Sequence, residues 1–387
     1  MPLCWSRAGI ACDTRTGCCT PCVDLAQAFW HSPCNEALGK AKWFFAWSLR
    51  YPTIGSISGG CMKEIQYLTS YKVVRKIASG GMGSVWLAEQ TGAEGFRKIV
   101  AIKTIKREFL QNEENVRLFV GEAKLVADLI HENVLQVYQL GETGGVYYIV
   151  MEYANGHNLA DFIKEHKTRQ KVTNVEIGAF VISRVARALD YAHRKNDMNG
   201  KPLNIVHRDV TPSNVIITIN GVVKLTDFGI AKAMTMNTPD EAEVIMGKLP
   251  YMSPEQAKFQ GTTPQSDIFS LGLVMYELLT NVVVYNVNDI DDLVDKMDNF
   301  SIKRPTQLNP HIPPKLEAIM LRCLETNPAN RYQSAEQVWK DLEHYMYDGG
   351  YGPTNVKLAR YLERLFPRDP ELGSRVALSS NRRPSKG

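Results

Sequence analysis

Apolar positions in the first part of the chain fall in short segments of the kind that form β-strands. These segments are rich in Val, Ile and aromatic residues, have Gly between them, and span residues 71–77, 83–89, 98–105, 134–142 and 146–152. Between the third and the fourth segment, apolar residues recur at close to helical spacing over residues 115–130, which predicts one helix within the strand-rich part.

After residue 158 the spacing becomes mainly helical. It predicts helices over residues 176–194, 267–280 and 314–325, and a short amphipathic helix over residues 356–365. No internal repeat is visible. A strand-rich half followed by a helix-rich half predicts an α+β protein with two lobes.

The composition narrows the class of protein but does not indicate a function. The chain has 387 residues, 44% of them hydrophobic and 22% charged, which is typical of globular proteins and excludes a mostly disordered or fibrous chain. The formal net charge of +4 does not indicate a nucleic-acid partner or a membrane surface. The longest strongly apolar run, residues 43–49, is far shorter than the roughly 20 residues that cross a bilayer. We therefore expect a cytoplasmic protein.

The first 61 residues differ from the rest. Seven of the eight cysteines and four of the six tryptophans precede residue 62. Cys19 and Cys22 form a C-x2-C pair, and Cys34 and His31 are candidates for two further zinc ligands. A second C-x2-C pair is missing, which disfavours a zinc site. Because nothing indicates export, a disulfide framework is disfavoured too.

The composition changes abruptly at Met62, and the sequence that follows is typical of the start of a folded domain. Our hypothesis is that translation begins at Met62 and that residues 1–61 are an upstream extension of the gene prediction. A disordered, thiol-rich leader is the alternative. Mass spectrometry of the native protein separates the two, because abundant peptides from residues 1–61 contradict the hypothesis.

Two motifs in the strand-rich half suit phosphate chemistry. A glycine-rich stretch, residues 77–85, lies between two predicted strands, where glycine lets backbone N–H groups approach phosphate oxygens. Lys103 lies on the third strand among apolar residues, and burying its charge requires an anion such as Glu122, 19 residues later. Taken singly, the first motif is more often a turn and the second a surface lysine beside a solvated glutamate.

The helix-rich half adds five further signals in a fixed order. They are His207-Arg208-Asp209 with Asn214, then Asp227-Phe228-Gly229, Ser253-Pro254-Glu255, Asp267 and Arg331. Together with the first two motifs, this series resembles the protein kinase family, and within it the bacterial Ser/Thr kinases of eukaryotic (Hanks) type, with details like those of a myxobacterial subgroup.

The resemblance covers residues 68–346 and implies a bilobal kinase fold. It places a small β-rich lobe with one helix at residues 68–152, a large helical lobe at residues 155–346, and a tail with a short helix at residues 349–387. The tail helix is expected to dock on the domain or on a partner, with Val356, Leu358, Ala359, Leu362 and Leu365 as its apolar positions. Cys323, in an apolar helix, is expected in the core.

The resemblance also implies ATP and Mg²⁺ and assigns their contacts. The loop over the phosphates comprises Ile77, Ala78, Ser79, Gly80, Gly81, Met82, Gly83, Ser84 and Val85. Lys103, held by Glu122, contacts the α- and β-phosphates, while Asp227 and Asn214 hold the metal ions. Asp209 accepts or orients the substrate hydroxyl. Adenine lies between Ile77, Val85 and Ala101 on one side and Ile216 on the other, with Met151 as gatekeeper and the backbone of Glu152 and Ala154 at its edge.

The sequence departs from the family pattern at two places. Ala78 replaces the first glycine of the loop, where a small side chain is expected to fit. Thr211 replaces the lysine that usually follows the catalytic aspartate by two residues, and Lys248 stands where the family has threonine. Our hypothesis is an exchange in which Lys248 reaches back to Asp209 and supplies the missing charge. A solvent-facing Lys248 and a weakened enzyme is the alternative.

Other matching residues suggest structural or regulatory roles. Glu255 and Arg331 are expected to form a buried ion pair, Asp267 to orient the catalytic loop, and Val126, His207 and Phe228 to stack in an apolar column. Arg208 is expected to bind a phosphate on Thr235 or Thr238, or else one of the loop carboxylates Asp240, Glu241 and Glu243, which gives constitutive activity.

We therefore interpret the chain as a protein Ser/Thr kinase acting on protein substrates, with autophosphorylation through a transient dimer. Ser/Thr rather than Tyr specificity depends on Pro212 and the catalytic-loop pattern. A nucleotide-binding pseudokinase scaffold is the alternative, supported by Thr211 alone. A small-molecule kinase is disfavoured by residues 253–256 and by Asp267 and Arg331, which resemble protein-substrate kinases.

Overall fold

The computed structural model describes residues 67–68, 71–79, 83–106, 110, 113–228, 247–299 and 301–367. Several predictions fall outside these ranges: those for residues 1–61, for Gly80, Gly81 and Met82, and for Thr235, Thr238, Asp240, Glu241 and Glu243. Within the ranges, none of the helices combines the length and the apolar character that a bilayer crossing requires.

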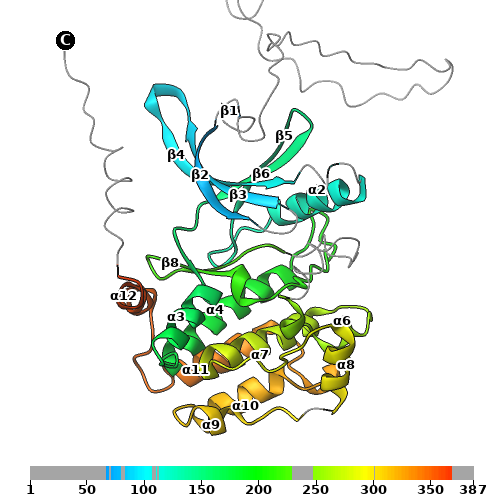
Figure 1. Ribbon diagram of the computed structural model, residues 1–387, viewed down its shortest axis with the longest axis vertical. Coiled ribbons are helices and arrows are strands. Elements are labelled where there is room, and N and C mark those ends of the chain that lie inside the picture. Colours follow the sequence, from blue (N-terminus) through cyan, green and yellow to red (C-terminus); the bar gives the residue numbers. More distant parts are fainter. Residues whose placement is uncertain are drawn as a thin grey trace, which may run out of the picture. The chain divides into compact units, whose positions relative to one another are not determined.

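The small lobe is an antiparallel sheet with one helix packed on it (Figure 1). The strands lie in the order β1-β2-β3-β4-β6-β5, and the helix α2 spans Glu113–Ala127. The strands are β1 (Tyr67–Leu68), β2 (Tyr71–Ser79), β3 (Gly83–Thr91), β4 (Arg97–Ile105), β5 (Val137–Thr143) and β6 (Val146–Glu152). Side chains of α2 and of the sheet face that it covers form one core, which includes Ala101, Phe119, Ala123, Ile149 and Met151.

The large lobe is built from helices around α4 (Val175–His193) and α7 (Pro264–Thr280). The other α-helices of the lobe among the described residues are α3 (Leu159–Thr168), α6 (Pro254–Ala257), α8 (Ile290–Asn299), α9 (Pro305–Leu308), α10 (Pro314–Cys323), α11 (Ala335–Tyr347) and α12 (Asn355–Leu365). α7 is buried along almost its whole length and is apolar around its circumference, as a central core helix must be.

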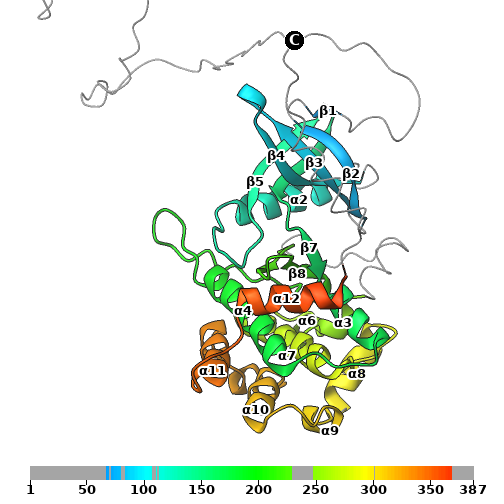
Figure 2. The same cartoon turned by 90° about the vertical axis from the view of Figure 1, so that its left-hand side faces the viewer.

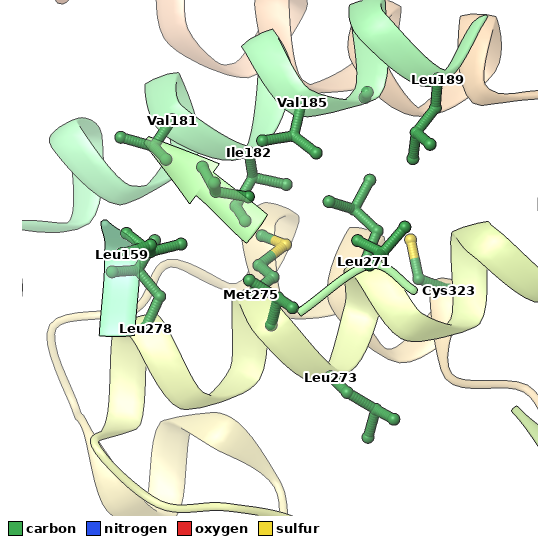
Figure 3. Close-up of a cluster of buried hydrophobic side chains, with 14 of the residues drawn as sticks. Leu159, Val181, Ile182, Val185, Leu189, Leu271, Leu273, Met275, Leu278 and Cys323 are labelled. Atoms are coloured by element: carbon green, nitrogen blue, oxygen red, sulfur yellow. The ribbon is translucent and has the colours of Figure 1, made fainter. Parts of the chain in front are cut away.

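The contact between α4 and α7 forms the centre of this core. Figure 3 shows Val181, Ile182, Val185 and Leu189 of α4 together with Leu271, Met275 and Leu278 of α7, and Cys323 beside Leu271. Cys323 is 1% exposed, which confirms its predicted place in the core. Complete burial of these side chains contributes about 1.5–3 kcal/mol each.

The predicted elements are present, with two instructive differences. The strand expected from residue 134 begins only at Val137, because Val134 bridges to Leu225 and the Leu135 N–H donates to the Leu225 carbonyl. A second sheet, of β7 (Gly156–Asn158), β8 (Val215–Thr218) and β9 (Val223–Leu225), was not predicted. Strands of three or four residues are too short to show an alternating pattern.

The predicted tail helix, α12, docks on the large lobe beside α3 and the strands β7 and β8 (Figure 2). Leu358, Leu362 and Leu365 are buried, which confirms docking on the domain, but Val356 was wrongly expected in the contact and is 59% exposed. It lies on the face of the helix turned away from the lobe. The Tyr361 hydroxyl forms a 2.7 Å hydrogen bond with His166 Nε2.

Candidate active site

Lys103 lies on β4 between two carboxylates. Its Nζ is 2.7 Å from Asp227 Oδ1 and 3.2 Å from Glu122 Oε1 on α2. Burial by itself lowers the pKa of Lys103, but the charges of Asp227 and then Glu122 outweigh it and raise the pKa above its ordinary value. The ammonium is therefore charged, and it links the small lobe to the segment that follows β9.

Asp209 lies in the loop before β8, with its side chain 4% exposed. The Asn214 amide nitrogen donates to the Asp209 carboxylate and to its backbone carbonyl, both at 2.8 Å. Lys248 Nζ also lies 2.8 Å from Asp209 Oδ2. The contact that the exchange hypothesis requires is thus present, whereas Thr211 is buried and uncharged.

The backbone on either side of this site has unusual dihedral angles. Arg208 has φ 65° and Asp227 has φ 55°, both in the left-handed region that side chains other than glycine seldom adopt. Such conformations persist only when their surroundings hold them, and they gather at functional sites.

Asp267 provides one of these restraints. Its carboxylate accepts hydrogen bonds from the backbone N–H groups of His207 (2.7 Å) and Arg208 (2.8 Å), and it contacts His193 Nε2 at 2.8 Å. Burial by itself raises the pKa of Asp267, but the hydrogen bonds from His193 and from the His207 N–H outweigh it and hold the pKa below its ordinary value. The predicted role in orienting the loop is confirmed.

His207 packs under the same loop. Burial lowers its pKa, so the ring is neutral. Its Nδ1 accepts from the Asp209 N–H, so Nε2 carries the proton and donates to the Thr226 carbonyl at 3.1 Å. The ring centroid lies 4.5 Å from that of Phe228, and Phe228 shares a core cluster with Val126, in agreement with the predicted column.

The predicted ion pair of Glu255 and Arg331 is also present. Arg331 NH1 and NH2 donate to the two oxygens of the carboxylate at 2.8 and 3.0 Å, and the Ser266 hydroxyl donates at 2.6 Å. Both residues are buried. Hydrogen bonds from Arg331 and Ser266 outweigh burial and lower the pKa of Glu255.

The sequence of the chain was compared with those of known protein families. The protein kinase domain family matches residues 71–342, which is more than half of the chain. The chain belongs to the protein kinase family.

Relatives of this chain come from several bacteria. The tyrosine-protein kinase MasK of Myxococcus xanthus is 35% identical over 314 residues, which are 81% of this chain and 49% of MasK. The serine/threonine-protein kinase PrkC of Bacillus subtilis is 33% identical over 273 residues (70% and 40%), and PknA of Mycobacterium tuberculosis is 34% identical over 270 residues (68% and 58%). The matched part of the chain thus spans about 40–60% of the length of these relatives.

Solved structures agree on the fold. A mutant form of the Mycobacterium tuberculosis PknI kinase domain is 25% identical, with a TM-score of 0.53 over 71% of this chain and 95% of that one. Another structure of the PknI kinase domain, 24% identical, has a TM-score of 0.54 over 75% and 99%. The two-lobed fold expected from the sequence is confirmed.

The structure describes the two ends of the glycine-rich loop, residues 77–79 and 83–85. A Cβ on Gly83 would lie 2.2 Å from the Thr104 carbonyl oxygen, so no side chain fits there. Ala78 pairs with Val85 in the sheet and does not have a positive φ, so an alanine is accommodated, as expected. Ser79 and Ser84 face each other, with hydroxyl oxygens 3.5 Å apart, and Ile77 is 38% exposed.

The pocket beside Lys103 is lined mainly by apolar side chains. Met151 lines it, and Ala101 and Val85 pack in the same cluster, while Ile216 lies half-buried on β8. Sequence reasoning missed several lining residues: Ala123, Leu135, Val137, Ile149 and Thr226. Their only signal was membership of predicted apolar elements, which does not show which face borders a cleft.

A further link at this cleft was not predicted. The Glu152 carboxylate lies 2.8 Å from Lys224 Nζ on β9. It ties the end of β6 to the strand that leads into Thr226 and Asp227. No spacing in the sequence indicates this pair, because the two residues are 72 positions apart.

Proposed function

We propose that this protein is an ATP-dependent protein serine/threonine kinase that transfers the γ-phosphoryl group to protein hydroxyls. One observation carries the proposal: Lys103, held by Glu122 and Asp227, lies in the same site as Asp209 with its partners Asn214 and Lys248. Phosphoryl transfer asks little covalent chemistry of the protein and depends on positioning and charge neutralisation. This group of residues can supply both.

The nucleotide would lie between the lobes. Lys103 is poised for the α- and β-phosphates, and the backbone from Ile77 to Val85 would cover them. Val85, Ala101 and Ile216 would enclose the adenine and Met151 would border it, leaving the backbone of Glu152 and Ala154 to meet the adenine edge. Apolar walls with a few fixed polar groups are typical of such pockets.

The residues present fit Mg²⁺. Asp227 offers a carboxylate that is 38% exposed, and the Asn214 amide nitrogen points to Asp209, which turns the amide oxygen to the opposite side. Oxygen ligands of this kind suit Mg²⁺, whose remaining ligands are commonly phosphate and water. When bound, the ion would neutralise phosphate charge. Asp209 would orient the substrate hydroxyl and accept its proton.

Lys248 would complete the charge balance. Its ammonium, at 2.8 Å from Asp209, lies where it can stabilise negative charge on the transferring group. This contact removes the main argument for a pseudokinase, since Thr211 no longer leaves the site without its cation.

The acceptor residue is part of the proposal. Serine and threonine are favoured by Pro212 and by the names of relatives such as PrkC and PknA, whereas the name of MasK points to tyrosine. Autophosphorylation at Thr235 or Thr238, through a transient dimer, and a cytoplasmic location stay predictions.

The test is transfer of labelled phosphate from ATP with Mg²⁺ to a generic acceptor such as myelin basic protein, followed by phosphoamino-acid analysis. Asp209→Asn is the matched control. Labelled serine or threonine that disappears in the variant supports the proposal. Labelled tyrosine would replace the acceptor class, and ATP binding without transfer would establish the scaffold alternative.

A further inference from the structure

Gln256 connects the substrate side of the site to the catalytic loop. It lies on α6, directly after the buried Glu255. Its amide nitrogen donates to the backbone carbonyl of Arg208 at 2.9 Å, across 48 positions of sequence. Its amide oxygen accepts from the Ser253 N–H at 3.1 Å, in a capping box that fixes the amide.

The carbonyl that Gln256 holds belongs to a strained residue. Arg208 has φ 65°, and its N–H is already restrained by Asp267 at 2.8 Å. Gln256 restrains the same residue from its other end. The peptide unit that it fixes joins Arg208 to Asp209, so its orientation sets the direction in which the Asp209 side chain leaves the backbone.

The anchor of this restraint is rigid. Glu255, the neighbour of Gln256, is bound by Arg331 at 2.8 Å within the core of the large lobe. In the same segment, Lys248 reaches the Asp209 carboxylate. Residues 248–256 therefore contact the catalytic loop at two points, at the side chain of Asp209 and at the peptide before it.

We propose that Gln256 is a positioning residue for phosphoryl transfer: it holds the Arg208–Asp209 peptide and thereby keeps the Asp209 carboxylate aligned. This inference rests on the proposed kinase function. It predicts an effect on turnover and not on nucleotide affinity, because Gln256 is not among the residues that line the pocket beside Lys103.

The chain provides a matched control for a test. Gln337 stands at the corresponding position of α11, three residues after the N-cap Ser334: its side-chain oxygen accepts from the Gln333 N–H at 3.0 Å, and its N–H donates to Ser334 Oγ at 3.3 Å. The corresponding N–H bond of Gln256, to Ser253 Oγ, is also 3.3 Å. Gln337→Met thus removes a comparable side-chain bond at a helix N-terminus without removing a bond to the catalytic loop.

The experiment compares Gln256→Met, Gln337→Met and wild type in kcat, in ATP affinity and in amide hydrogen exchange of peptides covering residues 205–215. For Gln256→Met we expect about a tenfold lower kcat, the value of one hydrogen bond, with ATP affinity unchanged and faster exchange in the loop. Gln256→Lys, which restores a donor of similar reach, should recover part of the kcat.

Other outcomes separate the positioning role of Gln256 from the proposed kinase function. If Gln256→Met and Gln337→Met match in both kcat and loop exchange, the positioning role is overturned. If Gln256→Lys recovers nothing that Gln256→Met loses, the hydrogen bond to Arg208 is not the cause. A wild-type protein that transfers no phosphate overturns the proposed function, and the exchange comparison still decides whether Gln256 holds the loop.

Discussion

Replacing Lys248 tests the most unusual feature of the site. The ammonium lies 2.8 Å from Asp209 Oδ2, and the two side chains are 20% and 4% exposed. At an effective dielectric constant of about 20, two unit charges at that distance interact by about 6 kcal/mol, which is an upper bound because desolvation opposes it. The short distance and the burial of Asp209 place the Lys248 ammonium at the site where the proposed transfer would occur.

The expected effect on the rate is smaller than this interaction. Removal of one charged or polar group that stabilises a transition state costs about 100-fold in kcat, or about 2.7 kcal/mol. We expect that loss for Lys248→Thr in steady-state phosphorylation at saturating ATP and acceptor. The double variant Thr211→Lys/Lys248→Thr, which restores the usual family arrangement, should regain most of it.

The control is Lys258→Thr, which breaks another lysine–carboxylate contact of the large lobe, with Asp298 at 2.6 Å. That pair is exposed and does not contact the catalytic loop, so kcat should be unchanged. If Lys248→Thr keeps kcat within about twofold of wild type, a factor worth less than 0.5 kcal/mol, the reasoning is refuted.

Three further predictions concern the rest of the protein. Glu255→Gln should lower the free energy of unfolding by about 3–5 kcal/mol in urea denaturation, because the Arg331 charge stays buried. The pKa of Glu255 is lowered on folding, so its contribution to stability is complete above the ordinary pKa of 4.5 and is lost as the pH falls through the lower folded pKa. Below pH 4.5 the stability of the variant should therefore depend less on pH than that of wild type. Gly221→Ala should loosen α12 and speed its cleavage by trypsin, because the new Cβ would lie 1.9 Å from the Asn355 carbonyl oxygen. Lys103→Met should lower phosphate transfer at least about 100-fold in the same steady-state assay.

Each of these has a control in the same chain. Glu336→Gln removes an exposed pair with Lys340 and should leave stability nearly unchanged. Gly145 has φ 78°, against 77° for Gly221, but no atom lies within 4 Å of its added Cβ, so Gly145→Ala carries the strain without the clash. The control for Lys103→Met is Lys98→Met, which changes a second lysine of β4, one whose ammonium lies over the Tyr138 ring. Equal trypsin rates for the two alanine variants would mean that Gly221 does not control α12.

Local patterns predicted the elements because those patterns are set by burial. The strands β2, β3, β4 and β6 were found within a few residues from their Val, Ile and aromatic content between glycines, and the helices α4, α7 and α10 from their apolar residues. The short strands β7, β8 and β9 were not predicted, because their sequences show no such local pattern. They are held by pairing with one another, and pairing between distant segments leaves no local period.

The chemistry of the site was predicted unevenly. Motif resemblance named Lys103, Asp209, Asn214 and Asp227, and the structure shows the ion pair of Lys103 with Asp227 and the hydrogen bond of Asn214 with Asp209. The pair of Glu152 and Lys224 was not predicted, because an ion pair between strands has no fixed spacing.

The sequence by itself determined the family, the order of strands and helices, and the residues that carry charge into the cleft, because those follow from periodicity and from motifs with a chemical reason. Only the tertiary structure decided the contacts that no motif indicates. Gln256 reaches the carbonyl of Arg208 across 48 positions, and Lys224 pairs with Glu152 across 72. The first of these contacts joins a left-handed backbone at Arg208 to a helix anchored by Glu255 and Arg331. Such conformations are imposed by the packed lobe and not by the neighbouring residues, so no local pattern contains them.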